Sequence, residues 1–235
     1  MSDKQVLIIT GTSKGTGRGM AEYFLDKGYK VFGCSRGESS IKLENYNHTQ
    51  VDVTDELQVQ KWMRSMKKTN KKIDAVISNA GLVESALQMV VTSGKIVQEI
   101  IQNNFIGSYF VCREAAKIMV SQNYGRIVTI SSTMTALHEP GTSAYSASKS
   151  AVVEMTKVLA KEVAPFSVTC NVVSPAMILN ERSLAFGEEW TNRILDKQSI
   201  KRKVTIEEVC HVISFLIAPE SSCITGEVIH MGIVN

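Results

Sequence analysis

Short apolar runs of the kind that form buried β-strands alternate along this chain with segments of helical periodicity. The apolar runs are QVLIIT, YKVFGCS, TQVDV, DAVISNA, RIVTISS, SVTCNVVS and EVIHM. Several of them lack polar alternation, as expected for strands that are covered on both faces. The segments with helical periodicity are 15–27, 55–67, 94–123, 145–163 and 205–217. This alternation predicts a parallel sheet with helices on both faces.

The alternation continues through all 235 residues without a linker, an internal repeat or a low-complexity tract. Hydrophobic residues make up 44% of the chain, which is enough to fill one substantial core. We therefore predict a single α/β domain over 1–235, with three layers and a doubly wound parallel sheet of the Rossmann type. The run 180–203 is polar and less regular, and we predict that it forms a flexible flap over the substrate.

Composition excludes several classes of partner. A formal charge of +3 is too small to indicate nucleic-acid binding, and the basic cluster between Lys61 and Lys72 is typical of a solvated helix face. A strand-like run begins at Gln5, where a signal peptide would lie, and no apolar stretch approaches the length of a membrane span. The five cysteines are scattered and never form a CxxC pair, so we expect five buried thiols, no metal site and a cytoplasmic protein.

The stretch TGTSKGTG lies directly between the first predicted strand and the first predicted helix. Glycines at Gly11, Gly15 and Gly17 keep side chains away from the backbone N–H groups at the positive end of that helix. A pyrophosphate can approach such a turn closely. A glycine-rich turn without a ligand could have the same composition, so the residues that follow must decide between the two.

A tyrosine and a lysine share one face of a later predicted helix. Tyr145 and Lys149 are four residues apart in YSASK. A nearby ammonium favours the phenolate, which lowers the ordinary tyrosine pKa of about 10 and suits the phenol for acid–base catalysis. Ser132 ends a predicted strand that carries it to the same cleft, where it can donate a hydrogen bond to a carbonyl oxygen. For an isolated pair, a packed ring with a snorkelling amine is the alternative.

These motifs, in this order, resemble those of the short-chain dehydrogenase/reductase family. The resemblance runs from Val6 to Gly232, nearly the whole chain. The residues that carry it are TGxxxGxG from Thr10, SNAG from Ser78, Asn104 in NNFIG, Ser132 in ISS, Tyr145 and Lys149 in YSASK, and NVVSPAMI from Asn171. The likeness implies an oxidoreductase that transfers a hydride between a nicotinamide coenzyme and a carbonyl or alcohol.

The resemblance also implies a role for each of four catalytic residues. Tyr145 would protonate the carbonyl oxygen, and Ser132 would hold that oxygen in place. Lys149 would tune Tyr145 and bind the nicotinamide ribose, while Asn104 would support a water chain that resupplies the proton.

The residues after the second predicted strand indicate which nicotinamide is bound. Ser35 and Arg36 stand where NAD-binding sites usually place an acid, and a hydroxyl and a guanidinium suit a 2′-phosphate. Lys14 adds a second cation, so we predict NADP(H) and the direction of reduction. The predicted coenzyme contacts are Gly11, Ser13, Lys14, Gly15, Thr16, Gly17, Ser35, Arg36, Asp52, Val53, Asn79, Ala80, Gly81, Tyr145, Lys149, Pro175 and Ile178.

The sequence departs from the family pattern in two places. The usual Pro-Gly after the sixth strand is Pro175–Ala176, and the threonine that follows it in the family is Asn180. The C-terminal glycine pair is reduced to Gly232 in HMGIV. None of the four catalytic residues is altered, so we expect these changes to affect coenzyme affinity and the end of the chain rather than catalysis.

The tail segments QSIKRKVTIEEVCHVISFL and SSCITGEVIHM resemble those of β-ketoacyl-[acyl-carrier-protein] reductases. This likeness predicts reduction of a 3-oxoacyl thioester. However, an acidic carrier protein favours basic residues beside the cleft, and the plausible docking stretches SQNYG and APFSV carry none. Another small ketone or a sugar therefore stays open as the substrate. A non-catalytic NADP-sensing protein is a third reading, although such proteins usually lose the active-site Tyr or Lys and this chain keeps both.

Two expectations concern contacts with other molecules. The predicted substrate contacts are Ser132, Met134, His138 and Tyr145, with Leu82, Val83, Glu84, Glu139 and Ile178 as further candidates for the pocket wall. From the family resemblance we also expect a homotetramer or homodimer that pairs the helices after Ser93 and Tyr145. Apolar stripes on those helices are explained equally well by burial against the sheet.

Overall fold

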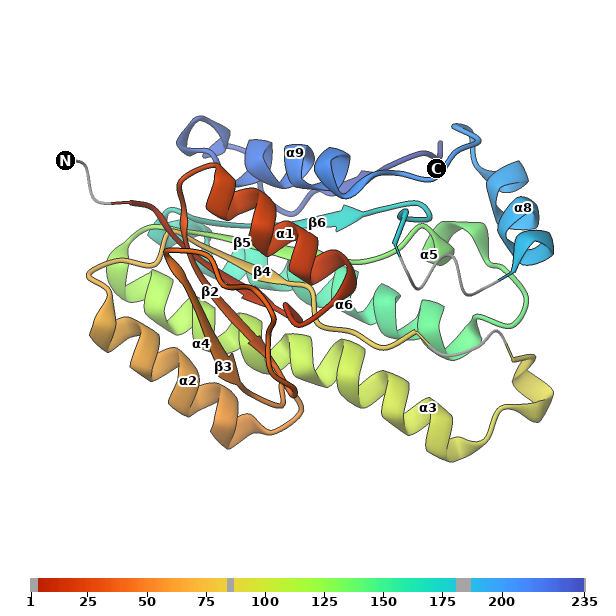
Figure 1. The fold of residues 1–235 in the computed structure, drawn as a ribbon, viewed down its shortest axis with the longest axis horizontal. Coiled ribbons are helices and arrows are strands. Elements are labelled where there is room, and N and C mark those ends of the chain that lie inside the picture. Colours follow the sequence, from red (N-terminus) through yellow and green to blue (C-terminus); the bar gives the residue numbers. More distant parts are fainter. Residues whose placement is uncertain (1–3, 84–86, 181–186, 235) are drawn as a thin grey trace.

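A computed structural model describes residues 4–83, 87–180 and 187–234 of the chain. These residues form a parallel sheet of seven strands in the order β3-β2-β1-β4-β5-β6-β7, with helices on both faces (Figure 1). The strands are β1 (Val6–Thr10), β2 (Lys30–Ser35), β3 (Tyr46–Gln50), β4 (Ala75–Ser78), β5 (Gly125–Ile130), β6 (Val168–Ser174) and β7 (Val228–His230). The predicted three-layer fold of the Rossmann type is confirmed.

Two sets of long helices form the outer layers (Figure 1). One face of the sheet is covered by α1 (Gly15–Asp26) and α9 (Ile206–Ile217), and the other by α2 (Glu56–Thr69), α4 (Gly107–Gln122) and α6 (Ser143–Val163). Each face has its own core. Phe24 and Ile213 are fully buried in the first, and Trp62 and Met119 are buried in the second.

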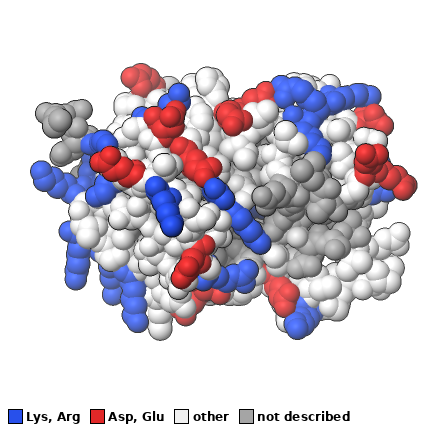
Figure 2. Space-filling model, in the orientation of Figure 1, with Lys and Arg blue, Asp and Glu red and all other residues white. Residues whose placement is uncertain are grey.

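The basic cluster predicted on the second helix has a structural role. Helix α2 begins after Asp55, whose side chain accepts a hydrogen bond from the backbone of Gln58 at 3.1 Å. Lys67 and Lys68 lie in its last turn, where positive charge stabilises the negative end of the helix dipole. Figure 2 shows basic side chains gathered at the lower left, in the position that α2 has in Figure 1.

The third strand lies earlier than TQVDV. Strand β3 is Tyr46–Gln50, and it pairs with β2 alone at the edge of the sheet. Most of its side chains are at least partly exposed, so its sequence YNHTQ has none of the apolar character that marks the central strands. Val51 and Val53, which suggested a strand, are buried just beyond its end.

The long helix predicted over 94–123 is interrupted. It consists of α3 (Gly94–Ile101), one turn of π-helix, η2 (Gln102–Ile106), and α4. Two further helices, α5 (Met134–Leu137) and α8 (Glu188–Lys197), were not predicted. Helix α8 lies within the predicted flap over 180–203, and residues 181–186 of that flap are outside the described part of the chain.

Cys34, Cys112, Cys170 and Cys210 are buried, as expected, whereas Cys223 is exposed. The expectation was wrong for Cys223 because that residue lies in the turn after the short helix η4 (Pro219–Ser221) rather than in a strand or helix. Among the described residues, no helix is long and apolar enough to cross a membrane, and no group of three potential metal-ligating side chains occurs.

Candidate active site

A cavity of about 1040 Å³ opens at the carboxyl ends of the parallel strands. It lies between β1 and β4, where the order of the strands reverses: the chain continues from β1 toward one edge of the sheet and from β4 toward the other. Sheets of this topology bind ligands at that point. Its volume is at the upper end of the range for ligand pockets, about 300–1,000 Å³. All seventeen predicted coenzyme contacts are among the residues that line it.

The glycine turn forms one end of this cavity and has room only for glycine at two positions. Gly11 has φ +79°, and a Cβ there would lie 3.0 Å from the Cα of Ala80. A Cβ on Gly17 would overlap the carbonyl oxygen of Gly11. Helix α1 begins in this turn, without a side-chain cap and without an acidic residue in its first turn. Its free N–H groups can therefore donate hydrogen bonds to a pyrophosphate.

Thr10, at the end of β1, joins the glycine turn to the segment after β4. Its hydroxyl accepts hydrogen bonds from the backbone N–H groups of Asn79 (3.0 Å) and Ala80 (2.9 Å). The Asn79 amide in turn donates to the carbonyl of Thr10 at 2.9 Å. Thr10 is missing from the predicted site. The threonine of the TG dipeptide was its sequence signal, and its role is to fix the floor of the cavity.

Two stretches flank the glycine turn on the side of β2 and β3. Ser35 ends β2, and Arg36 and Lys14 are exposed at the rim of the cavity. Asp52 accepts hydrogen bonds from the backbone N–H of Thr54 at 2.9 Å and from its hydroxyl at 2.8 Å. A tight turn therefore holds Asp52 and the adjacent buried Val53 against the cavity wall.

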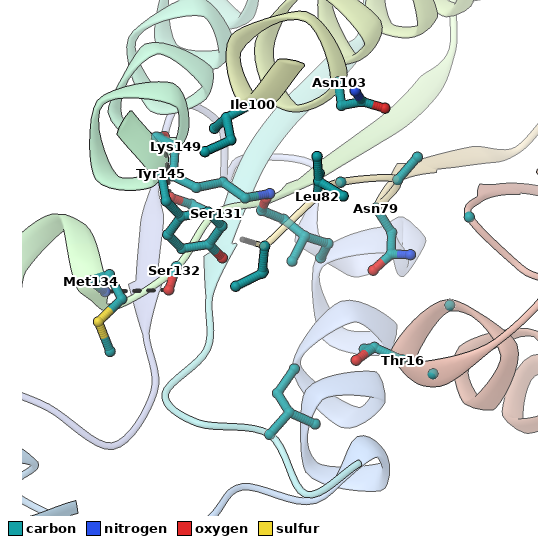
Figure 3. A pocket seen from close by; sticks show the side chains of 18 of the residues that line it. Thr16, Asn79, Leu82, Ile100, Asn103, Ser131, Ser132, Met134, Tyr145 and Lys149 are labelled. Atoms are coloured by element: carbon teal, nitrogen blue, oxygen red, sulfur yellow. Dashed lines mark hydrogen bonds between the residues drawn. The ribbon is translucent and has the colours of Figure 1, made fainter. Parts of the chain in front are cut away.

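Ser132, Tyr145 and Lys149 meet at the other end of the cavity (Figure 3). Tyr145 and Lys149 extend side by side from α6, and the Ser132 hydroxyl lies on the side to which the phenol points. The backbone N–H of Met134, in α5, donates to Ser132 Oγ at 3.3 Å. This bond orients the hydroxyl as a donor toward the cavity.

Lys149 is a buried cation at the base of the site. Its ammonium donates to the backbone carbonyl of Ile130 at 2.7 Å. Burial lowers the pKa of Lys149 from 10.5 to about 8. An ammonium held in so poorly solvated a place acts strongly on a neighbouring phenol, because fewer water molecules screen its charge.

Asn104 supports the site from behind rather than lining the cavity. The π-turn η2 directs its side chain inward, where Oδ1 accepts from the backbone N–H of Leu82 at 2.6 Å and Nδ2 donates to the carbonyl of Leu82 at 2.9 Å. Nδ2 also lies 3.0 Å from Ser148 Oγ of α6. Gly81 fits between the side chains of Asn104 and Lys149, since a Cβ there would lie 3.2 Å from Asn104 Oδ1 and 3.4 Å from Lys149 Nζ.

The segment after β6 closes the cavity over the glycine turn. Asn180 donates from Nδ2 to the hydroxyl of Thr16 at 3.1 Å, so it contacts the first turn of α1. Ala176, at the position of the usual glycine, is accommodated by the glycine that remains near the C-terminus. A Cβ on Gly232 would approach within 2.9 Å of the Ala176 methyl. The glycine that the C-terminal pair keeps thus makes room for the alanine that replaces the usual glycine after β6.

The part of the cavity beyond Tyr145 has an apolar wall. Met134, Met177 and Ile194 form a buried cluster against which Tyr145 and Trp190 pack. Further apolar side chains in the lining are Leu82, Val83, Leu87, Ile96, Ile100 and Ile178. Helix α8 supplies Trp190 and Ile194, so it forms part of this wall. Glu84 lies outside the described residues.

Two predicted pocket residues are directed elsewhere. His138 is absent from the lining of the cavity and faces a separate shallow pocket beside β7. Glu139 is almost fully buried and forms ion pairs with Arg193 and Lys197 of α8. Glu139 thus attaches α8 to the loop between α5 and α6 and shapes the apolar wall indirectly.

Comparisons with known proteins identify the family. Residues 11–232 match the family described as enoyl-(acyl-carrier-protein) reductase. The 3-oxoacyl-[acyl-carrier-protein] reductase of Buchnera aphidicola subsp. Schizaphis graminum is 31% identical over 235 residues, which cover 97% of this chain and 96% of the relative. The enzyme of the same name from Salmonella typhimurium is 28% identical over 233 residues, which cover 97% of this chain and 95% of the relative.

Solved structures agree with these matches. The structure of ElxO with NADP bound superposes with a TM-score of 0.90 at 30% identity, covering 97% of both chains. A variant actinorhodin polyketide ketoreductase with NADPH has a TM-score of 0.88 at 24% identity, covering 98% of this chain and 97% of the other, and it supports the fold alone. The sequence matches establish that the chain belongs to the short-chain dehydrogenase/reductase family of oxidoreductases.

Proposed function

We propose that this protein uses NADPH to reduce a ketone to a secondary alcohol, and that the ketone is a 3-oxoacyl thioester carried by an acyl-carrier protein. The observation that carries the proposal is the convergence of Ser132, Tyr145 and Lys149 at one end of a cavity whose other end is the glycine turn. A coenzyme laid along this cavity would bring its reactive ring to the three catalytic side chains.

The nicotinamide supplies the hydride when it is bound. Tyr145 donates the proton that the carbonyl oxygen takes up, and Ser132 stabilises the same oxygen by a hydrogen bond as negative charge develops on it. Lys149 holds its positive charge close to the phenol and favours release of that proton. Asn104 acts as a positioning residue through its hydrogen bonds to Leu82 and Ser148. We also propose that a chain of water molecules passes Asn104 and resupplies the proton to Tyr145.

Three cations or donors at the rim favour NADPH over NADH. Ser35, Arg36 and Lys14 surround the position expected for the 2′-phosphate, and a bidentate guanidinium is well suited to a phosphate. ElxO, with 30% identity over 97% of its length, was solved with NADP bound. The remaining predicted contacts follow the cavity from the glycine turn to Pro175 and Ile178.

The apolar wall supports an acyl chain as the substrate. Met134, Met177 and Trp190 offer no hydrogen-bond pattern that would recognise the several hydroxyls of a sugar. The relatives named as 3-oxoacyl-[acyl-carrier-protein] reductases favour a carrier-bound thioester. The lack of basic residues in SQNYG and APFSV favours a free apolar ketone as the second candidate. An NADP sensor is disfavoured because the catalytic side chains are all present.

We further propose that the protein is cytoplasmic, and that it assembles as a homotetramer or homodimer, as its family resemblance implies. The five cysteines are all free thiols, which is in keeping with a reducing compartment. Sedimentation of the full chain at several concentrations tests the assembly, and a monomer throughout would contradict it.

A substrate panel tests the function with oxidation of NADPH as the readout. We expect acetoacetyl-[acyl-carrier protein] to be reduced faster than the acetoacetyl thioester of N-acetylcysteamine. Equal rates would remove the carrier from the proposal, and activity confined to a free diketone would favour the second candidate. A crotonyl thioester tests reduction of a carbon–carbon double bond instead. NADPH binding without turnover of any compound would favour the sensor, and absence of binding would overturn the proposal.

A further inference from the structure

A tyrosine and a histidine on the edge strand contact the glycine turn and the residues that are predicted to bind the 2′-phosphate. Strand β3 pairs with β2 so that His48 stands opposite Gly33 and Tyr46 stands opposite Val31. A Cβ on Gly33 would lie 2.5 Å from the Tyr46 hydroxyl oxygen, so glycine at this position leaves space for that hydroxyl to reach Thr12 in the glycine turn. None of the catalytic steps uses this pair.

A chain of hydrogen bonds runs from the glycine turn to the loop after β2. The Tyr46 hydroxyl oxygen lies 2.9 Å from Thr12 Oγ1, which is buried, and 3.1 Å from His48 Nδ1. On the other side of the ring, His48 Nε2 lies 2.9 Å from the carbonyl oxygen of Gly37 and 3.2 Å from Ser35 Oγ. His48 therefore connects the glycine turn, where the pyrophosphate is predicted to bind, with Ser35, which is predicted to bind the 2′-phosphate.

The partners of His48 decide which ring nitrogen carries the proton. A carbonyl oxygen can only accept, so Nε2 must be protonated to bond to Gly37. In the neutral ring, Nδ1 then accepts from the hydroxyl of Tyr46 or of Thr12, which lies 3.5 Å away. The geometry thus fixes His48 as a donor toward the loop after β2.

This donor matters because of what Ser35 does. In this structure the Ser35 hydroxyl donates its only proton to the carbonyl of Gly37 at 2.9 Å. To bind a phosphate, the hydroxyl must turn that proton away from Gly37. His48 continues to donate to the same carbonyl, so the loop after β2 keeps its attachment to β3 when the serine turns.

We propose that His48 is a positioning residue that sets the specificity for NADPH. It holds the backbone of Gly37 and frees the Ser35 hydroxyl to donate to the 2′-phosphate. The inference rests on the proposed choice of coenzyme, and it adds a specificity determinant that does not itself touch the coenzyme. The Ser35 hydroxyl that it frees serves the 2′-phosphate alone, so the binding of NADH, which lacks that group, should be unaffected.

Two substitutions of His48 separate this role from simple packing. The amide of His48→Gln can reach the position of Nε2, whereas that of His48→Asn reaches only the position of Nδ1. We expect the dissociation constant for NADPH, measured by fluorescence titration without a ketone, to rise about tenfold in His48→Asn, as for the loss of one hydrogen bond to a charged group. His48→Gln should stay within about threefold of the wild type, and NADH binding should change less than about twofold in either variant.

A double substitution shows whether His48 acts through Ser35. In a Ser35→Ala background, His48→Asn should weaken NADPH binding by less than about twofold. Asn47→Ala, on the opposite face of the same strand, is the matched control and should change nothing. Additive losses in the double variant, equal losses for NADPH and NADH, or failure of His48→Gln to restore binding would overturn the inference. Equal affinity of the wild type for the two coenzymes would instead overturn the proposed coenzyme choice.

Discussion

Replacing Lys149 by methionine should stabilise the protein near neutral pH while abolishing its activity. Lys149 is buried in the wall of the cavity, and loss of hydration is the effect that shifts its pKa. A group kept charged in such a place lowers the stability of the fold, and the role we propose for Lys149 in catalysis would account for it. Methionine has a similar length and no charge, so it fills the space without the ammonium.

The magnitude follows from the pKa and the hydrogen bond. Burial lowers the pKa of Lys149 from 10.5 to about 8. At about 1.4 kcal/mol per pKa unit, holding the ammonium in the folded protein costs about 3 kcal/mol at pH 7. Methionine removes this cost but loses the bond to Ile130, which stabilises by about 1–2 kcal/mol. We expect the variant to be more stable by about 1–2 kcal/mol at pH 7.

The sign of this difference should reverse at high pH. Between pH 8 and 10.5 the unfolded chain still holds the proton that the folded protein has released, so the contribution of Lys149 to stability rises with pH. Near pH 10.5 the charge no longer matters, and only the lost hydrogen bond remains. The variant should then be less stable than the wild type by about 1–2 kcal/mol.

Urea unfolding of both proteins between pH 7 and pH 10, without coenzyme, measures the effect. Both proteins carry Tyr145→Phe as well, because Lys149 is expected to lower the pKa of that phenol. The remaining titrating groups are common to the two proteins, so they cancel in the difference between the free energies of unfolding. A difference that stays constant across this pH range would refute the reasoning, because it would mean that Lys149 titrates alike in the folded and unfolded chain.

Three more substitutions test separate parts of the site. Tyr145→Phe should lower turnover by about 100- to 10,000-fold, by steady-state kinetics, with NADPH affinity within about twofold of the wild type; unchanged turnover would exclude the phenol as proton donor. Gly17→Ala should destabilise the protein by about 1–3 kcal/mol in urea and weaken NADPH binding, because its methyl overlaps backbone. Gly94→Ala, whose methyl meets nothing, is the control. Glu139→Gln should raise KM for the ketone and leave KM for NADPH unchanged, because it loosens α8; equal rises in both would contradict this.

The coenzyme half of the cleft could be predicted because it is made mainly of backbone and strand ends. Gly11 and Gly17 are required by contacts that no side chain could tolerate, so the sequence has to display them. Ser35 and Asn79 come directly after strands whose buried apolar runs are easy to recognise. Thr10 was missed, although it stands in the same motif, because its role is a hydrogen bond to a segment almost seventy residues away.

Other features depend on interactions that leave no local pattern. The π-turn that directs Asn104 inward interrupts a segment whose apolar periodicity fits one continuous helix. Strand β3 is an edge strand of mostly polar residues, and two of them, Tyr46 and His48, form a hydrogen-bond network that no local pattern announces. Helix α8 is attached by the buried Glu139, which in the sequence is one acid in a loop.

The two halves of the cleft also differ in how freely they can change. The glycine turn, Thr10 and Asn79 hold one another through backbone contacts, so a change in any of them disturbs the whole coenzyme site. The apolar wall comes from separate elements, α3, α5, α8 and the segment after β6, and its shape depends mainly on how their apolar side chains pack. Substitution of Met134 or Trp190 can therefore reshape the space for the ketone while the proton donor and the coenzyme site stay in place.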